Sequence, residues 1–390
     1  MNRQGAKTPR NYEFHFVPFL VTDWLASCPA ALEDCRMKMV GIFPFLFAQA
    51  AFGLTEAEFQ KLHRELQPSA KAIEAAIGKS LVLLKKSSTT YPTQRTCFSC
   101  HHQALPPLTL ALARERGFTV DAKPMREQSE LTHEFFSNRK DKMPQGKGVP
   151  GGSYTTGYAL LALAADGWPA DEITGAMVHH LLKRQEKNGR WSMGTKRPPL
   201  EYSDFTSTAL ALRGLQLFAG KEKTEETAKR VARARKWLLV AKPKENEDRI
   251  WHLLGLKWSG AKDEAIAQAA KALLKEQRPD GGWAQTAKMK SDPYATGQAL
   301  AALHLAGGVP VKNDQWQKGI AWLLRAQLAD GSWKVKSRSK PFQKYFESGY
   351  PHGKDQFISI SAGSWATIAL LLTRSPAKDQ PPTPLAVRLN

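Results

Sequence analysis

The sequence predicts an all-α fold, a toroid of six helix pairs written (α/α)6. Three observations lead to it. A pattern Q-x-x-x-G-x-W occurs three times, beginning at Gln185, Gln277 and Gln327. Each copy lies between two stretches whose apolar residues recur at helical spacing. The stretch after each copy is richer in Ala and Leu than the stretch before it, so the first helix of a pair suits an outer ring and the second an inner ring.

The helix pairs can be placed in order along the chain. The first two copies are nearly twice as far apart as the last two, so one degenerate copy lies between them. In the complete copies the Gly ends the first helix and the Trp packs over the turn, whereas the degenerate copy has both helices without the turn pattern. The six pairs are 69–86 with 104–117, 128–140 with 151–167, 173–185 with 203–218, 224–242 with 246–258 (the degenerate copy), 265–277 with 291–308, and 316–327 with 359–374.

The N-terminal region carries the layout of a secretory signal peptide. Basic residues precede an apolar run from Val40 to Phe47, and Ala48-Gln49-Ala50 supplies an A-x-A cleavage site. This layout begins well inside the chain, so we interpret residues 1–36 as a doubtful leader, an artefact of start-codon choice. Translation from Met37 or Met39 then gives a periplasmic or secreted protein, and without such a start we expect a cytoplasmic one.

The chain accordingly divides into five segments. The toroid occupies most of it, and the Pro-rich C-terminal tail has the composition of a disordered segment. The segments are the doubtful leader 1–36, the signal peptide 37–52, a linker 53–68, the toroid 69–374 and the tail 375–390.

Positive charge dominates the composition, with Lys+Arg 56 against Asp+Glu 36 and a formal net charge of +20. The basic residues are scattered, without a dense run or an aromatic-interleaved basic motif, so we expect a basic surface and no nucleic-acid partner. No apolar stretch reaches the roughly 18 residues of a membrane span, and no transmembrane segment is expected.

The repeat pattern resembles that of squalene-hopene cyclases and of the related protein prenyltransferase β-subunits. The resemblance covers residues 69–374, and the segment 341–370 is also similar to bacterial members of this repeat family. It implies the α/α toroid fold and an apolar or isoprenoid ligand in the toroid. Fold alone does not establish the chemistry.

The resemblance also implies where a catalytic acid would lie. Class II terpene cyclases use an Asp in D-x-D-D-T-A at the start of an inner helix, and the matching stretch here is "DFTSTA". Asp204 fits the first Asp and is the candidate acid, but Thr206 and Ser207 replace the acidic pair. A threonine hydroxyl cannot deliver the proton that starts the reaction. The other interpretation, which we favour for both Asp204 and Asp292, is that each caps the N-terminus of its helix.

A prenyltransferase would need a zinc site of the Asp, Cys, His type near the same rim. Tyr294 stands where a thiol would follow Asp292, so this chain departs from that pattern too. Several residues near the starts of the inner helices are nevertheless expected to line an apolar cavity. These candidates are Tyr154, Thr206, Asp292, Tyr294, Phe357 and Trp365.

The stretch "CFSCHH" takes the place of the turn pattern in the first pair. Cys97, Cys100 and His101 have the spacing C-x-x-C-H that is typical of covalent haem c attachment, with the His as an axial ligand of the iron. Haem c is attached outside the cytoplasm, which agrees with the predicted export. The sixth ligand is open, with four candidates in the chain. These are His102, His133, Met143 and His352.

Other interpretations of this stretch remain open. Zinc is the alternative cofactor, with Cys97, Cys100 and two further ligands, for which His102, His133 and His352 are the candidates. A redox dithiol or a structural disulfide needs only the two cysteines.

Three functions follow from these residues. The first is an exported toroid with one haem c at its mouth and an electron-transfer or ligand-binding role, which implies a redox partner. The second is an enzyme acting on an isoprenoid, a cyclase-like or prenyltransferase-like protein with a non-standard acid. The third is a non-catalytic toroid held by zinc or a disulfide.

Overall fold

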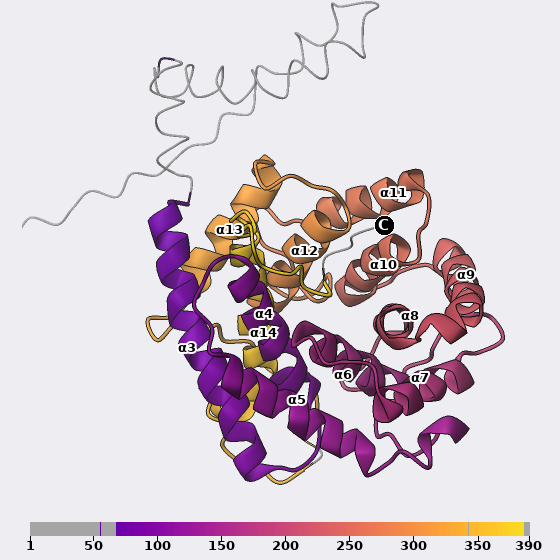
Figure 1. The fold of residues 1–390 in the computed structure, drawn as a ribbon. Helices are drawn as coiled ribbons and strands as arrows, with labels where there is room; N and C mark the ends of the chain where they lie inside the picture. The colour runs from indigo at the N-terminus through magenta and orange to yellow at the C-terminus, as the bar shows by residue number, and fades with distance from the viewer. Residues whose placement is uncertain (1–54, 56–67, 342, 386–390) are drawn as a thin grey trace, which may run out of the picture. The chain divides into compact units, whose positions relative to one another are not determined.

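The structure is a computed structural model, and it describes residue 55 and residues 68–341 and 343–385. In these residues twelve α-helices form six consecutive pairs, which confirms the all-α toroid (Figure 1). The outer helices are α3 (Ala70–Gln94), α5 (Ala122–Ser137), α7 (Glu172–Arg184), α9 (Thr224–Val240), α11 (Asp263–Lys275) and α13 (Asp314–Ala326). The inner helices are α4 (Leu105–Glu115), α6 (Ser153–Ala165), α8 (Asp204–Phe218), α10 (Asn246–Trp258), α12 (Pro293–Leu305) and α14 (Gln356–Leu371).

The inner helices close a ring. Each contacts the next along the chain, from α4 through α6, α8, α10 and α12 to α14, and α14 packs back on α4. Almost every residue of α6, α12 and α14 is buried, because these helices contact neighbours on all sides. That environment explains their Ala- and Leu-rich composition, which has no polar face.

Two glycines allow the inner helices to approach closely. A Cβ on Gly157 of α6 would lie 2.9 Å from the carbonyl oxygen of Leu210 on α8. A Cβ on Gly297 of α12 would lie 2.6 Å from the backbone nitrogen of Ala366 on α14. Both distances are shorter than a carbon atom tolerates, so only glycine permits this spacing of the helix axes.

The Q-x-x-x-G-x-W turns join neighbouring outer helices. The Gln side chain that follows one outer helix donates to a backbone carbonyl of the next, from Gln185 to Arg230, from Gln277 to Gln315 and from Gln327 to Ala76. The last of these bonds connects α13 to α3 and closes the outer ring. The three Trp side chains are fully buried and donate to carbonyls of the preceding outer helix, Trp191 to Leu181, Trp283 to Leu273 and Trp333 to Leu323.

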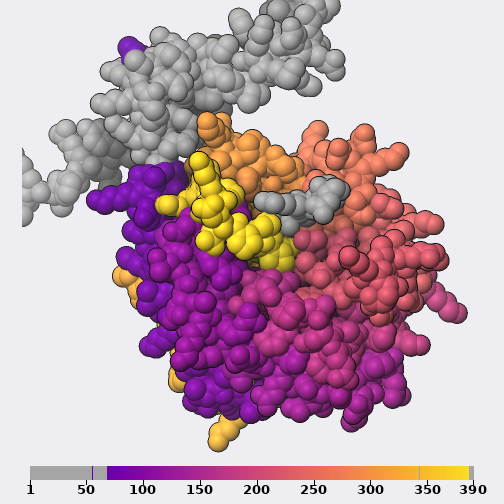
Figure 2. All heavy atoms as spheres, viewed as in Figure 1, coloured from indigo at the N-terminus to yellow at the C-terminus, as the bar shows by residue number. Residues whose placement is uncertain are grey.

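The C-terminal tail is packed on the toroid as far as Leu385, contrary to the expectation of a disordered segment (Figure 2). Thr383 donates its amide to the buried Glu115 carboxylate, 2.7 Å away, and Arg213 donates to the Pro384 carbonyl at 3.0 Å. Leu385 is 1% exposed. The residues that anchor the tail, Glu115 and Arg213, lie on inner helices. The composition of the tail alone therefore did not reveal that it packs on the toroid.

Two of the expected segments, the leader 1–36 and the signal peptide 37–52, and nearly all of the linker 53–68, lie outside the described residues. Within the part that the structure describes, no helix has the length and apolar character needed to cross a membrane.

Candidate functional site

The starts of the inner helices meet at one end of the toroid, which we call the mouth. Thr206, Glu247 and Tyr294 come from the first turns of α8, α10 and α12, and their side chains bond to one another. Sequence reasoning named Thr206 and Tyr294 but missed Glu247. Glu247 is the second residue of its helix, as Tyr154 and Tyr294 are of theirs, so aligning the inner helices by their starts would have found it.

Glu247 is held by donors from three inner helices. Its Oε1 accepts from Thr206 Oγ1 at 3.2 Å and from Trp251 Nε1 at 2.8 Å. Its Oε2 accepts from the Tyr294 hydroxyl at 3.0 Å, and from the Gln298 amide at 3.0 Å in the carboxamide orientation that satisfies its neighbours. When the carboxyl group is protonated, it donates its own O–H along one of these contacts.

Burial dominates the electrostatics of this carboxyl group. Glu247 is 4% exposed, and loss of hydration raises its pKa to about 8, although the bonds from Tyr294, Thr206 and Trp251 lower it. The group is therefore mostly protonated at neutral pH. A protonated carboxylic acid fixed in an apolar interior is the arrangement expected of a general acid.

Aromatic rings surround the acid. Trp251 packs edge-to-face against Tyr158 at 6.0 Å and against Trp365 at 6.1 Å between ring centroids. The Tyr158 hydroxyl is buried and has no hydrogen-bond partner among the described residues. Aromatic faces attract positive charge, and a shell of them beside an acid suits a cationic intermediate.

Thr206 departs from the cyclase motif, and its hydrogen bond to Glu247 gives it a place in this site. Where related cyclases carry an acid in the D-x-D-D stretch, Thr206 donates to the acid of the next inner helix. The carboxyl group thus lies one helix further along the ring.

Asp204 has another role. Its carboxylate accepts from Arg190 at 2.9 Å and from the Met193 amide at 2.7 Å, so it fixes the turn before α8. The residue that caps α8 is Ser203, so the expectation that Asp204 caps this helix is wrong by one residue. Asp292 does cap α12, as expected, and burial raises its pKa to about 6.

Of the six residues expected to line a cavity, only Tyr294 lines the space beside Glu247, and for the other five this role stays a prediction. Tyr154 and Trp365 are each 1% exposed, and Tyr154 donates to the Cys100 thiol at 3.2 Å. Phe357 packs at the mouth against His101, with 5.0 Å between ring centroids.

Two loops cover the mouth, residues 192–203 before α8 and residues 334–341 after α13. We call them the mouth loops. Ser339 donates to the Pro198 carbonyl at 2.8 Å, which ties one loop to the other. Arg338 donates to Gln285 at 3.3 Å and pairs with Glu245 at 3.5 Å. The space beneath them, which Glu247 and Tyr294 line with Pro199 and Arg338 of the mouth loops, leaves no room for a water molecule in this conformation.

The C-x-x-C-H segment lies at the same end of the toroid. Cys100 begins a short π-helical turn, Cys100–Ala104, and is buried, whereas Cys97 is exposed. The two thiols are free and contact different tyrosines, Tyr91 for Cys97 at 3.3 Å and Tyr154 for Cys100. Burial raises the pKa of the Cys100 thiol to about 12, and burial together with Arg197 lowers the pKa of His101 to about 3.

The segment supplies the two thiols and the histidine that haem c attachment requires, but it leaves no space for the haem. An axial histidine must present a ring nitrogen to the iron. Both ring nitrogens of His101 lie within 3.2 Å of the Ser99 hydroxyl, and its ring contacts His102 and Phe357. In this arrangement the segment does not fit a haem, and attachment stays a prediction.

The other proposed metal ligands are dispersed. His133 pairs with Asp171 at 2.9 Å, Met143 is fully buried in the core, and His352 bonds to Ser332 at 2.8 Å. Among the described residues, no three His, Cys, Asp or Glu side chains form a group that could hold a metal ion.

Solved structures share this fold. The type II terpene cyclase MstE from Scytonema, without ligand, superposes with a TM-score of 0.54 at 15% identity, over 78% of this chain and 99% of that one. A variant of the same cyclase in complex with geranylgeranyl dihydroxybenzoate gives 0.53 at 17% identity, over 80% and 98% of the two chains.

Sequence comparison finds similarity over part of the chain. A model described as the squalene-hopene cyclase C-terminal domain matches residues 250–367. Lanosterol synthase of Saccharomyces cerevisiae is 30% identical over 114 residues. Over these residues the chain is similar to terpenoid cyclases. The segment matched to lanosterol synthase spans 29% of this chain and only 14% of lanosterol synthase.

Proposed function

We propose that the toroid is an enzyme that starts a reaction on an isoprenoid by protonating it, with Glu247 as the acid. The observation that carries this proposal is a buried carboxyl group, protonated at neutral pH, inside a shell of aromatic side chains. The recorded substrate of the MstE variant, geranylgeranyl dihydroxybenzoate, supports an isoprenoid as the ligand class.

In the proposed reaction Glu247 donates its proton and becomes a carboxylate. The bonds from Thr206, Trp251 and Tyr294 then stabilise the anion, because each donor is already in place. The substrate becomes a cation, which the rings of Trp251, Tyr158 and Trp365 stabilise through their faces.

The chemistry of a carboxylic acid favours one kind of acceptor, because such an acid transfers its proton more readily to an oxygen than to a carbon–carbon double bond. We therefore propose a polyprene with a terminal epoxide or carbonyl oxygen as the substrate.

The test is turnover of such polyprenes, followed by mass spectrometry of the products. We expect the wild type to convert an epoxide-bearing polyprene and Glu247→Gln to lose activity by about a hundredfold or more, since it keeps the shape without the proton. Asp204→Asn is the matched control, because Asp204 serves the turn before α8. Unchanged turnover in Glu247→Gln would refute the role of Glu247. A loss of activity in Asp204→Asn as large as that in Glu247→Gln would indicate that the acid is instead Asp204, in the stretch that matches the cyclase motif.

A further inference from the structure

Three of the six junctions between outer helices lack the turn, and the one between α9 and α11 belongs to the degenerate repeat. After α9 only residues 241–245 lead to α10, and they contain no Gln, Gly or Trp. These residues lack the side-chain amide with which Gln185, Gln277 and Gln327 bridge to the next outer helix elsewhere. In place of the indole N–H of a turn Trp, His252 donates to the carbonyl of Leu238 near the end of α9.

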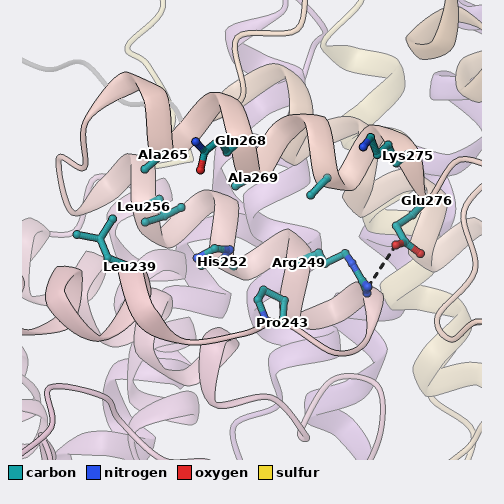
Figure 3. Close-up of a pocket in the computed structure, with 11 residues that line it drawn as sticks. Leu239, Pro243, Arg249, His252, Leu256, Ala265, Gln268, Ala269, Lys275 and Glu276 are labelled. Atoms are coloured by element: carbon teal, nitrogen blue, oxygen red, sulfur yellow. Dashed lines mark ion pairs between the residues drawn. The ribbon is translucent and has the colours of Figure 1, made fainter.

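A groove lies at this junction (Figure 3). It has a volume of about 450 Å³, within the range of small-molecule sites, and is formed by α9, α10 and α11. Leu239, Leu256 and Ala265 lie at one end, and Arg249, Lys275 and Glu276 at the other. Leu239 is 53% exposed and the adjacent Val240 is 75% exposed, so α9 ends in two exposed apolar side chains.

The polar end of the groove carries a net positive charge. Arg249 pairs with Glu276 at 3.2 Å, and Lys275 adds a second cation beside them. His252, which also lines the groove, is neutral, because burial lowers its pKa. Its Nε2 donates to the Leu238 carbonyl at 2.9 Å, so its Nδ1 is an acceptor. The groove thus combines an apolar floor, one acceptor and an excess cation.

We propose that this groove binds a small amphipathic anion, with a ring system of about indole size on the apolar floor and a carboxylate or sulfonate facing Arg249 and Lys275. The size follows from the groove volume of about 450 Å³ and the charge from its cationic end. The site is separate from Glu247 and does not depend on the proposed reaction.

The probe for this site is 1-anilinonaphthalene-8-sulfonate, an aromatic body with one sulfonate, titrated into the full chain by fluorescence and calorimetry. Ala272→Trp fills the groove, because Ala272 lines it from α11. Ala267→Trp is the matched control, since Ala267 is exposed on the same helix and does not line the groove. Arg249→Gln removes the cation, and Lys271→Gln is its control on α11.

We expect saturable binding at one site. The dissociation constant should rise about tenfold in Ala272→Trp and in Arg249→Gln, which is the usual cost of losing contact area or a charged hydrogen bond, and stay unchanged in both controls. Unfolding midpoints confirm that each variant is folded. Binding that survives Ala272→Trp and Arg249→Gln, or that falls equally in Ala267→Trp, would overturn the proposal.

Discussion

Replacing Glu247 with glutamine is expected to stabilise the protein at neutral pH and to leave its stability near pH 4 almost unchanged. In the unfolded chain the carboxyl group ionises with its ordinary pKa of 4.5, whereas in the folded protein its pKa is about 8. Its contribution to stability is therefore fully present below pH 4.5 and is lost as the pH rises through the folded pKa. Glutamine is neutral at every pH, so the variant has no such loss.

The size of the effect follows from the two pKa values. Each pH unit above the ordinary pKa costs about 1.4 kcal/mol until the folded pKa is reached. At pH 7 the cost is about 3 kcal/mol, and it levels off near 5 kcal/mol above pH 8. Glutamine retains an oxygen to accept from Thr206 and Trp251. The substitution therefore removes the free-energy cost of keeping a carboxyl group protonated in the folded protein, with little change in packing.

Urea unfolding of the wild type and Glu247→Gln at pH 4, 7 and 8.5 measures this difference. Glu226→Gln is the control, because Glu226 lies exposed on α9 and pairs with Arg230 at 2.9 Å. We expect the gap between wild type and Glu247→Gln to widen with pH, while Glu226→Gln follows the wild type. If Glu247→Gln and the wild type show the same dependence on pH, the carboxyl group is not held protonated and the reasoning fails.

Four further predictions concern other parts of the chain. Trp283→Ala should lower the free energy of unfolding, measured by urea denaturation, by about 3–5 kcal/mol, because a fully buried indole and its hydrogen bond to the carbonyl of Leu273 are lost. A change below about 1 kcal/mol would mean that the turns do not stabilise the toroid. In a Cys28→Ser, Cys35→Ser background, native thiol titration should show a fast phase that Cys97→Ser removes and Cys100→Ser keeps, since of the two cysteines that the structure describes only Cys97 is exposed; equal rates would contradict the described burial. Glu115→Ala should release the tail and speed its proteolysis, seen by mass spectrometry, whereas an unchanged cleavage pattern would show that the bond from Thr383 is not its anchor. Expression from Met37 in a host with c-type maturation tests the haem prediction: because the packing of His101 leaves no room for a haem, an unstained, folded protein is expected, and a haem-stained band on a denaturing gel that is lost in Cys97→Ala, Cys100→Ala would show that the segment rearranges to take up haem.

The fold could be predicted from the sequence because its signals are local and repeated. Gln185, Gln277 and Gln327 mark turns that recur with the period of a helix pair, and the Ala/Leu-rich members identify the inner ring. The tail was not predictable in this way, since its order depends on Glu115, which is distant in the sequence.

The candidate site was predictable only in part. Tyr294 and Thr206 were named from their places near the starts of inner helices, and both contact the acid. Glu247 was missed because it lies in the copy without a turn pattern and outside the family motif. Its raised pKa arises from burial in the assembled ring, which no local pattern reports.

The bond from Gln327 to the Ala76 carbonyl places the first and last repeats side by side, so the order of repeats around the ring has no structural beginning. The chain could therefore be circularly permuted. Joining the segment after α14 to the segment before α3, and opening the chain at residues 241–245, would place the new termini where no Gln bridge has to be cut. Such a permutant should fold to the same ring, and evolution could have recruited new terminal extensions at that point without disturbing the interior.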